Sequence, residues 1–285
     1  MSKNGLPRKP LTKRRLKNLI LNVLKNPFNM VVLVSLIILF CLIIIPLLTM
    51  ISSTFTLAQG ELRRVQGHVG DFTLYYWKYI LASTMSGAVL WGPLKNSFIC
   101  GFFTVLVSVP LGSVLAWLMI RTDIPGKKIL GLLVTVPYMI PSWTKALAWL
   151  AMFRNSTSGA NGFLAGMGIP IPDWLAYGPI AIVLCMSMHY YAFSYIMVSG
   201  ALRSINSELE EMGEIQGASK AQILRHITLP LILPSVLSAT VMTISKSIGT
   251  YGVPANLGNR IGYYTLATKM RNFIDQGPQA VGYSM

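Results

Sequence analysis

The sequence predicts an all-α membrane protein built as a polytopic helical bundle. Hydrophobic residues make up 53% of its 285 residues and charged residues only 12%, against roughly 25% charged residues in a typical soluble domain. The mean hydropathy is +0.56. Five apolar runs are each long enough, at about 1.5 Å per helical residue, to cross about 30 Å of hydrocarbon. These five expected spans cover residues of about 29–52, 96–120, 129–153, 179–199 and 230–250.

The N-terminal tail, residues 1–27, concentrates positive charge ahead of the first span. Its eight basic residues are Lys3, Arg8, Lys9, Lys13, Arg14, Arg15, Lys17 and Lys25. Because basic residues accumulate on the cytoplasmic side of membrane proteins, we expect a cytoplasmic N-terminus, with residues 28–285 forming a multi-pass membrane domain. In that orientation 14 Lys and Arg face the cytoplasm and eight face outward, which agrees with the rule.

The net charge of +15 would also suit a protein that binds nucleic acid. Here, however, the basic residues do not share one face with interleaved aromatic side chains, as they do in nucleic-acid-binding surfaces. We therefore expect the lipid bilayer, and no nucleic acid, as a partner. Cys41, Cys100 and Cys185 lie in apolar runs without the close spacing of metal or redox sites, so no metal site and no cofactor is expected.

The second and third spans are joined by a short cytoplasmic turn. Pro125 and Gly126 form a dipeptide that is typical of such turns. Within the third span, Pro137 and Pro141 each remove an intrahelical hydrogen bond, so we expect one helix with a kink. Kinked helices are suited to lining a path through the membrane, although packing alone is an equally open explanation for two membrane prolines.

Three polar side chains inside the expected spans are candidates for a translocation path, together with Pro137 and Pro141. Lys145 in the third span and Lys246 in the fifth are the only formal charges there, and an ammonium group facing lipid is costly. His189 lies in the fourth span. Lysine beside histidine would suit an anionic solute. The alternatives are snorkelling of the lysines to the interface and, for His189, a hydrogen bond to a neighbouring helix.

An acid-rich polar loop, residues 200–229, joins the fourth and fifth spans and is expected in the cytoplasm. Two capping boxes, which satisfy the N–H groups of a first helical turn, predict two short helices in it. The pairs are Ser207 with Glu210 and Ser219 with Gln222. We expect Gly217 to end the first helix in a left-handed conformation and Pro230 to begin the fifth span.

The first of these short helices should carry a narrow apolar stripe. Leu209, Met212 and Ile215 recur at three-residue spacing, so they share one face of a helix. The flanking acids are Glu208, Glu211 and Glu214. An apolar stripe needs a partner, which indicates a docking element. The alternative is a solvated connector with ordinary capping.

The loop resembles the EAA loop of binding-protein-dependent ABC importer permeases. Glu211 is followed six residues later by Gly217, and nine further residues lead to Ile227-Thr-Leu-Pro230. Three other segments look like the core of type I permeases: Leu94-Lys-Asn-Ser97, Arg121-Thr-Asp-Ile-Pro-Gly126 and Pro137-Tyr-Met-Ile-Pro141. Finally, Tyr251-Gly-Val-Pro-Ala-Asn-Leu-Gly258 looks most like permeases of ferric-iron and related small-solute importers.

The resemblance implies the permease subunit of an ATP-driven importer in a bacterial inner or plasma membrane, carrying a small solute such as ferric iron. Its implied partners are a cytoplasmic ABC ATPase, an extracytoplasmic solute-binding protein, and a second permease half or a homo- or heterodimer partner. The implied coupling residues are Glu211, Met212, Gly213, Gly217, Ile227, Leu229 and Pro230. Met212 and Gly213 stand where the family usually has two alanines, which changes the shape of the coupling contact.

The family pattern also contains a sixth span, so the chain is expected to be truncated or to be the leading part of a fused two-half permease. Catalysis is not expected, because none of the five spans contains Asp or Glu and the sequence has no phosphate-binding Walker loop. Two other functional classes remain as alternatives to an ABC importer permease. An ion-coupled secondary transporter normally places carboxylates in its spans, and a membrane-anchored scaffold would need neither kinked prolines nor intramembrane lysines.

Overall fold

The structure is a computed structural model that describes residues 27–62, 65–155, 159, 161–206 and 208–275. The predicted basic tail, Ser207 and residues 276–285 lie outside these ranges. Every regular element within the described residues is helical, apart from one isolated bridge between Thr56 and Phe72. This confirms the all-α prediction. The chain divides into two compact units, residues 1–76 and 77–284.

The first unit contains a long apolar helix and a loop that folds back on itself. Helix α2, Pro27–Ser53, has no charged residue and is long and apolar enough to cross a membrane. After it, the rings of Phe55 and Phe72 stack with centroids 5.9 Å apart. The buried Tyr76 closes the loop, because its hydroxyl accepts a hydrogen bond of 3.0 Å from the Ala58 N–H.

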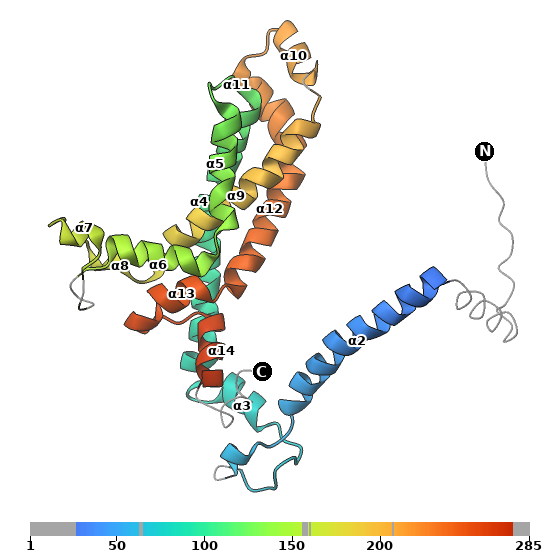
Figure 1. Cartoon of the computed structure of the whole chain (residues 1–285), viewed down its shortest axis with the longest axis vertical. Coiled ribbons are helices and arrows are strands. Elements are labelled where there is room, and N and C mark those ends of the chain that lie inside the picture. The colour runs from blue at the N-terminus through green and yellow to red at the C-terminus, as the bar shows by residue number, and fades with distance from the viewer. Residues whose placement is uncertain (1–26, 63–64, 156–158, 160, 207, 276–285) are drawn as a thin grey trace, which may run out of the picture. The chain divides into compact units, whose positions relative to one another are not determined.

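The second unit is a bundle arranged around α9, which packs most extensively against α4, α5 and α12 (Figure 1). The four helices of this bundle are α4 (Gly92–Arg121), α5 (Lys127–Met139), α9 (Pro179–Ser204) and α12 (Leu229–Gly249). Two groups of buried apolar side chains follow α9. One surrounds Ile182 and Met186 near its start, and the other surrounds Val198 and Leu202 near its end.

The α4 and α9 helices approach each other closely at Gly112. A Cβ atom at this position would lie 2.4 Å from the Tyr191 carbonyl oxygen and 2.7 Å from the Ser194 Cβ. Only a glycine fits such a contact with the partner backbone, and small residues at helix crossings are typical of membrane bundles. Gly112 therefore sets the distance between the two central helices.

The expected third span is not one kinked helix, and that prediction is wrong. Helix α5 ends at Met139 and a separate helix, α6, runs from Ser142 to Phe153. Figure 1 shows α6 running across the direction of α5. The reason is Pro141, which lacks an N–H and forces the preceding Ile140 into an extended conformation with φ −79° and ψ 130°. The chain leaves the bundle axis at this point.

The remaining elements are short. The α-helices among them are α3 (Tyr75–Ala82), α7 (Phe163–Gly166), α8 (Asp173–Ala176), α10 (Glu208–Ile215), α11 (Lys220–Ile223), α13 (Gly252–Leu257) and α14 (Leu266–Asp275). Two π-helical turns cover Gly87–Trp91 and Leu224–Thr228, and two 3₁₀ turns cover Gln59–Glu61 and Asn259–Ile261. Helices α10 and α11 lie at one end of the bundle, and α13 and α14 lie toward the other (Figure 1).

Candidate functional site

Helix α10 presents the apolar stripe predicted from its sequence, and the stripe is exposed. Leu209, Met212 and Ile215 have exposed fractions of 47%, 56% and 85%. Glu211 and Glu214 are exposed beside them. A surface helix normally buries its apolar face, so α10 is suited to contact another molecule through this stripe and its acidic border.

Gly217 ends α10 in the left-handed conformation that the sequence predicts. Its φ is +82°, and two backbone hydrogen bonds close the helix end. The Ala218 N–H donates to the Gly213 carbonyl at 3.0 Å, and the Gly217 N–H donates to the Glu214 carbonyl at 2.9 Å. This pair of bonds is the Schellman motif, which turns the chain sharply from α10 toward α11.

Gly213 packs against the second half of the same loop, at Ile223 and Ile227. A Cβ atom on it would lie 3.2 Å from side-chain carbons of both Ile223 and Ile227. Ile223 is buried and Ile227 is half-buried, so these three residues form the small apolar core that holds α10 against α11. Of the predicted coupling residues, Gly213 and Ile227 therefore face inward, whereas Glu211 and Met212 face outward.

The capping box of α11 forms as predicted, and α11 leads directly into the helix that contains Pro230. The Ser219 and Gln222 side chains and backbone N–H groups bond reciprocally. Helical structure then continues without a break from Lys220 to Gly249. A π-helical turn at Leu224–Thr228 precedes Leu229 and Pro230, and its wider ring makes room for a proline inside a helix. Pro230 is the second residue of α12, as the sequence predicts, but the π-helical turn joins that helix to α11.

A buried ion pair that the sequence analysis missed ties α10 to the bundle. Glu210 Oε2 lies 3.0 Å from Arg121 Nε at the end of α4, and the two side chains are only 18% and 16% exposed. The Thr228 hydroxyl donates to Glu210 Oε1 at 2.7 Å. Glu210 was expected to cap its own helix with Ser207, which lies outside the described residues. The signal for the pair was an acid in the polar loop of residues 200–229 and an arginine at the polar end of the second apolar run.

The break between α5 and α6 holds Lys145 in place. Pro141 has no N–H, so the Pro137 carbonyl, four residues earlier, loses its intrahelical donor. The Lys145 ammonium donates to this carbonyl and also contacts His189 Nδ1 on α9. Both Lys145 and His189 are half-buried. Four of the five predicted path residues thus meet at the break.

Lys246 joins the same group from α12. Its Nζ lies 3.1 Å from the Tyr138 hydroxyl and 4.9 Å from the centre of the Phe193 ring. The Tyr138 ring in turn stacks on His189, with ring centroids 5.4 Å apart. A cavity of about 570 Å³ opens at this cluster. Its lining residues are Tyr138, His189, Tyr190, Ser245, Lys246 and Gly249.

The electrostatics of this intramembrane cluster favour an anion. It combines two ammonium groups with a histidine and tyrosine hydroxyls, while all nine acidic residues of the chain lie outside α4, α5, α6, α9 and α12. Unpaired cations among apolar helices are costly, and an anion in the cavity would offset that cost. The described residues contain no group of three or more His, Cys, Asp or Glu that could hold a metal ion.

Comparison with known proteins gives a consistent set of relatives. Residues 108–284 match the family model described as "Binding-protein-dependent transport system inner membrane component". The chain is 24% identical over 202 residues to the sulfate transport system permease protein CysT of Salmonella typhimurium, which covers 67% of this chain and 71% of that protein. It is 27% identical over 166 residues to the molybdenum transport system permease protein ModB of Escherichia coli K12. That match covers 57% of this chain and 69% of that protein.

A third relative is the probable sulfate transport system permease protein cysT of Marchantia polymorpha, with 27% identity over 180 residues. That match covers 62% of this chain and 59% of the relative, so the chain spans less than two thirds of the relative's length. None of these three relatives is named as a ferric-iron permease, and the resemblance to iron permeases is not supported.

Among solved structures, the chain is similar to a bacterial ABC transporter involved in the import of the acidic polysaccharide alginate. The TM-score is 0.66 at 19% identity, with 94% of this chain and 91% of that chain covered. It is also similar to the MetNI methionine ABC transporter, with a TM-score of 0.52 at 22% identity. That match covers 70% of this chain and 87% of that chain. At these identities the likeness shows the fold alone.

Proposed function

Because the chain belongs to the family of binding-protein-dependent transport system inner membrane components, we propose that it is the membrane-spanning permease subunit of an ATP-driven ABC importer. The observation that carries the proposal is helix α10. Its exposed apolar stripe, acidic border and glycine-terminated end make it suited to docking into a cytoplasmic ATPase subunit. The coupling residues are then Glu211 and Met212 on the contact face, with Gly213, Gly217, Ile227, Leu229 and Pro230 shaping the loop.

The proposed orientation places α10 and α11 in the cytoplasm and follows from the distribution of basic residues. Residues 1–27 are then a cytoplasmic tail, and residues 28–285 a multi-pass domain of a bacterial inner membrane. The other partners are an extracytoplasmic solute-binding protein and a second permease subunit. The intramembrane cluster around Lys145, His189 and Lys246 would lie on the path between the two subunits.

For the solute we propose a small oxyanion. The CysT and ModB relatives carry sulfate and molybdenum in their names, and the intramembrane cluster is cationic. Lys145 and Lys246 would balance the charge of the anion, and the Tyr138 hydroxyl, which accepts from Lys246, would donate a hydrogen bond to one of its oxygen atoms. Ferric iron suits this cluster poorly, because a cation would be repelled by two ammonium groups.

Uptake into proteoliposomes tests the function. We expect sulfate or molybdate uptake when the chain is reconstituted with its ATPase and binding protein, and we expect it to require ATP and to be blocked by vanadate. Uptake driven by a proton or sodium gradient without ATP would instead establish a secondary transporter. Binding of the ATPase without any solute uptake would favour a scaffold.

The intramembrane charge can be tested with Lys145→Met, which removes the ammonium and keeps the length of the side chain. We expect transport of the oxyanion to fall about tenfold or more, because a charge-assisted hydrogen bond contributes about 1.5–3 kcal/mol. Co-purification with the ATPase should not change. Lys78→Met, at an exposed lysine of α3, is the matched control. Equal transport by both variants would assign Lys145 a purely structural role at the helix break.

The turn after α10 can be tested with Gly217→Asp. A side chain in the left-handed region costs about 1–2 kcal/mol, so we expect α10 to rotate relative to α11 and solute-stimulated ATP hydrolysis to drop several-fold. The control is Gln216→Asp, which adds the same carboxylate one residue earlier in an exposed position. If both variants lose stimulation equally, the added charge is responsible and the left-handed turn is not.

A further inference from the structure

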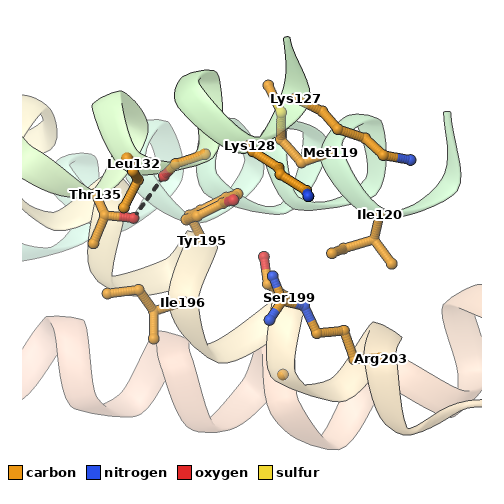
Figure 2. Close-up of a pocket in the computed structure, with 12 residues that line it drawn as sticks. Met119, Ile120, Lys127, Lys128, Leu132, Thr135, Tyr195, Ile196, Ser199 and Arg203 are labelled. Atoms are coloured by element: carbon orange, nitrogen blue, oxygen red, sulfur yellow. Dashed lines mark hydrogen bonds between the residues drawn. The ribbon is translucent and has the colours of Figure 1, made fainter. Parts of the chain in front are cut away.

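A second cavity lies between α4, α5 and α9 (Figure 2). Its volume is about 760 Å³. Apolar side chains from three helices form part of the wall: Met119, Ile120, Leu132 and Ile196. Three cations also line it, Lys127 and Lys128 at the start of α5 and Arg203 near the end of α9. The cavity is thus amphiphilic.

Two of the three cations have no acidic partner. Lys127 Nζ lies 3.1 Å from Asp123 Oδ1, which balances its charge. All nine acidic residues of the chain fall within the described residues, and none of them lies within ion-pair distance of Lys128 or Arg203. In Figure 2, Lys128 and Arg203 point toward each other from the two sides of the cavity, whereas Lys127 points away. Like charges facing each other across a cavity repel, and an anion between them removes the repulsion.

Ser199 supplies an independent observation that points to a ligand. The residue is only 5% exposed, and its hydroxyl has no hydrogen-bond partner within the described part of the protein. It lines the cavity one helical turn before Arg203, and its oxygen points into the cavity (Figure 2). Buried hydroxyls are nearly always hydrogen-bonded, and an acceptor atom in the cavity would supply the missing partner of Ser199.

We propose that this cavity binds an oxyanion group, with Lys128 and Arg203 balancing its charge and the Ser199 hydroxyl donating to one of its oxygen atoms. The site is separate from the intramembrane cluster. Ser199 follows His189 by ten residues on the same helix, a distance of about 15 Å along α9. Two sources have the required chemistry, a free oxyanion such as sulfate and the phosphate of an anionic lipid headgroup. The proposal stands whether or not the chain transports an oxyanion.

Binding measurements on the purified full chain test the site. The background carries Lys145→Met and Lys246→Met, so that the intramembrane cluster cannot bind the anion. One arm titrates sulfate into nanodiscs of phosphatidylcholine, and the other replaces part of that lipid with phosphatidylglycerol and identifies retained lipid by native mass spectrometry. Sulfate binding identifies a free-anion site, and selective retention of phosphatidylglycerol identifies a lipid site.

Three variants test whether the measured binding of sulfate or phosphatidylglycerol takes place in the cavity. Lys128→Gln combined with Arg203→Gln should weaken binding about tenfold or more, and Ser199→Ala should weaken it several-fold. Arg225→Gln, which removes an exposed cation outside the cavity, should leave binding unchanged. If the background does not fold, protection of residues 195–203 from hydrogen exchange by either probe, measured in the wild-type chain, replaces the binding readout. Binding of neither probe, or equal binding by all variants, overturns the proposal.

Discussion

Gly112→Leu is expected to destabilise the bundle strongly. Its Cβ alone would lie 2.4 Å from a carbonyl oxygen of α9, so the two central helices must separate before a side chain fits. Overpacking costs typically 1–3 kcal/mol, and a clash with backbone falls at the upper end, about 3 kcal/mol. We expect a clearly lower thermal midpoint and poor recovery in detergent.

The matched control is Gly200→Leu on α9. Gly200 is exposed, and a Cβ there would meet nothing within 4 Å. The same change in size and helix propensity is therefore made without a clash. If the two variants melt at the same temperature, the close approach of α4 and α9 does not limit stability.

Glu210→Ala is the second change with a large expected effect. It leaves the Arg121 guanidinium, which is 16% exposed, without its carboxylate, and it removes the acceptor of the Thr228 hydroxyl. Breaking a largely buried pair by removing one partner costs about 3 kcal/mol. We expect α10 to lose its fixed position on the bundle, so transport and solute-stimulated ATP hydrolysis should fall about tenfold or more, while the ATPase still co-purifies.

Glu214→Ala removes an exposed acid from the same helix and should have little effect. Exchange of the charges, with Arg121→Glu and Glu210→Arg together, should recover part of the activity that either single change removes. Two results would show that the ion pair has no part in coupling ATP hydrolysis to transport. One is equal transport by Glu210→Ala and Glu214→Ala, and the other is transport by the exchanged pair no higher than that of the single variants.

The parts of the fold that follow from local sequence could be predicted. The left-handed Gly217 and the Ser219 capping box each depend on residues within one turn of one another, and both are present. The common face of Leu209, Met212 and Ile215 on α10 follows from their three-residue spacing. The all-helical architecture follows from long apolar runs, which leave the backbone no other way to satisfy its hydrogen bonds in lipid.

The features that depend on contacts between distant elements could not be predicted. Glu210 looked like a capping residue because its partner Arg121 lies 89 positions earlier in the numbering. The two membrane prolines predicted a kink, but Pro141 instead breaks the helix, because it leaves the Pro137 carbonyl without a donor and holds Ile140 in an extended conformation. Lys145, His189 and Lys246 were predicted as candidates for one translocation path, but the contacts that join them, through the Pro137 carbonyl and Tyr138, could not be predicted from the sequence.

The continuous helical segment from Lys220 to Gly249 connects the α10–α11 end of the bundle to the intramembrane cluster. Its 30 residues extend over about 45 Å, and the π-helical turn admits Pro230 without dividing it. A tilt of about 5° at the α11 end therefore moves the far end by about 4 Å. Lys246 lies at that far end against Tyr138, so such a tilt would move its ammonium group away from the Tyr138 hydroxyl by more than the length of their hydrogen bond.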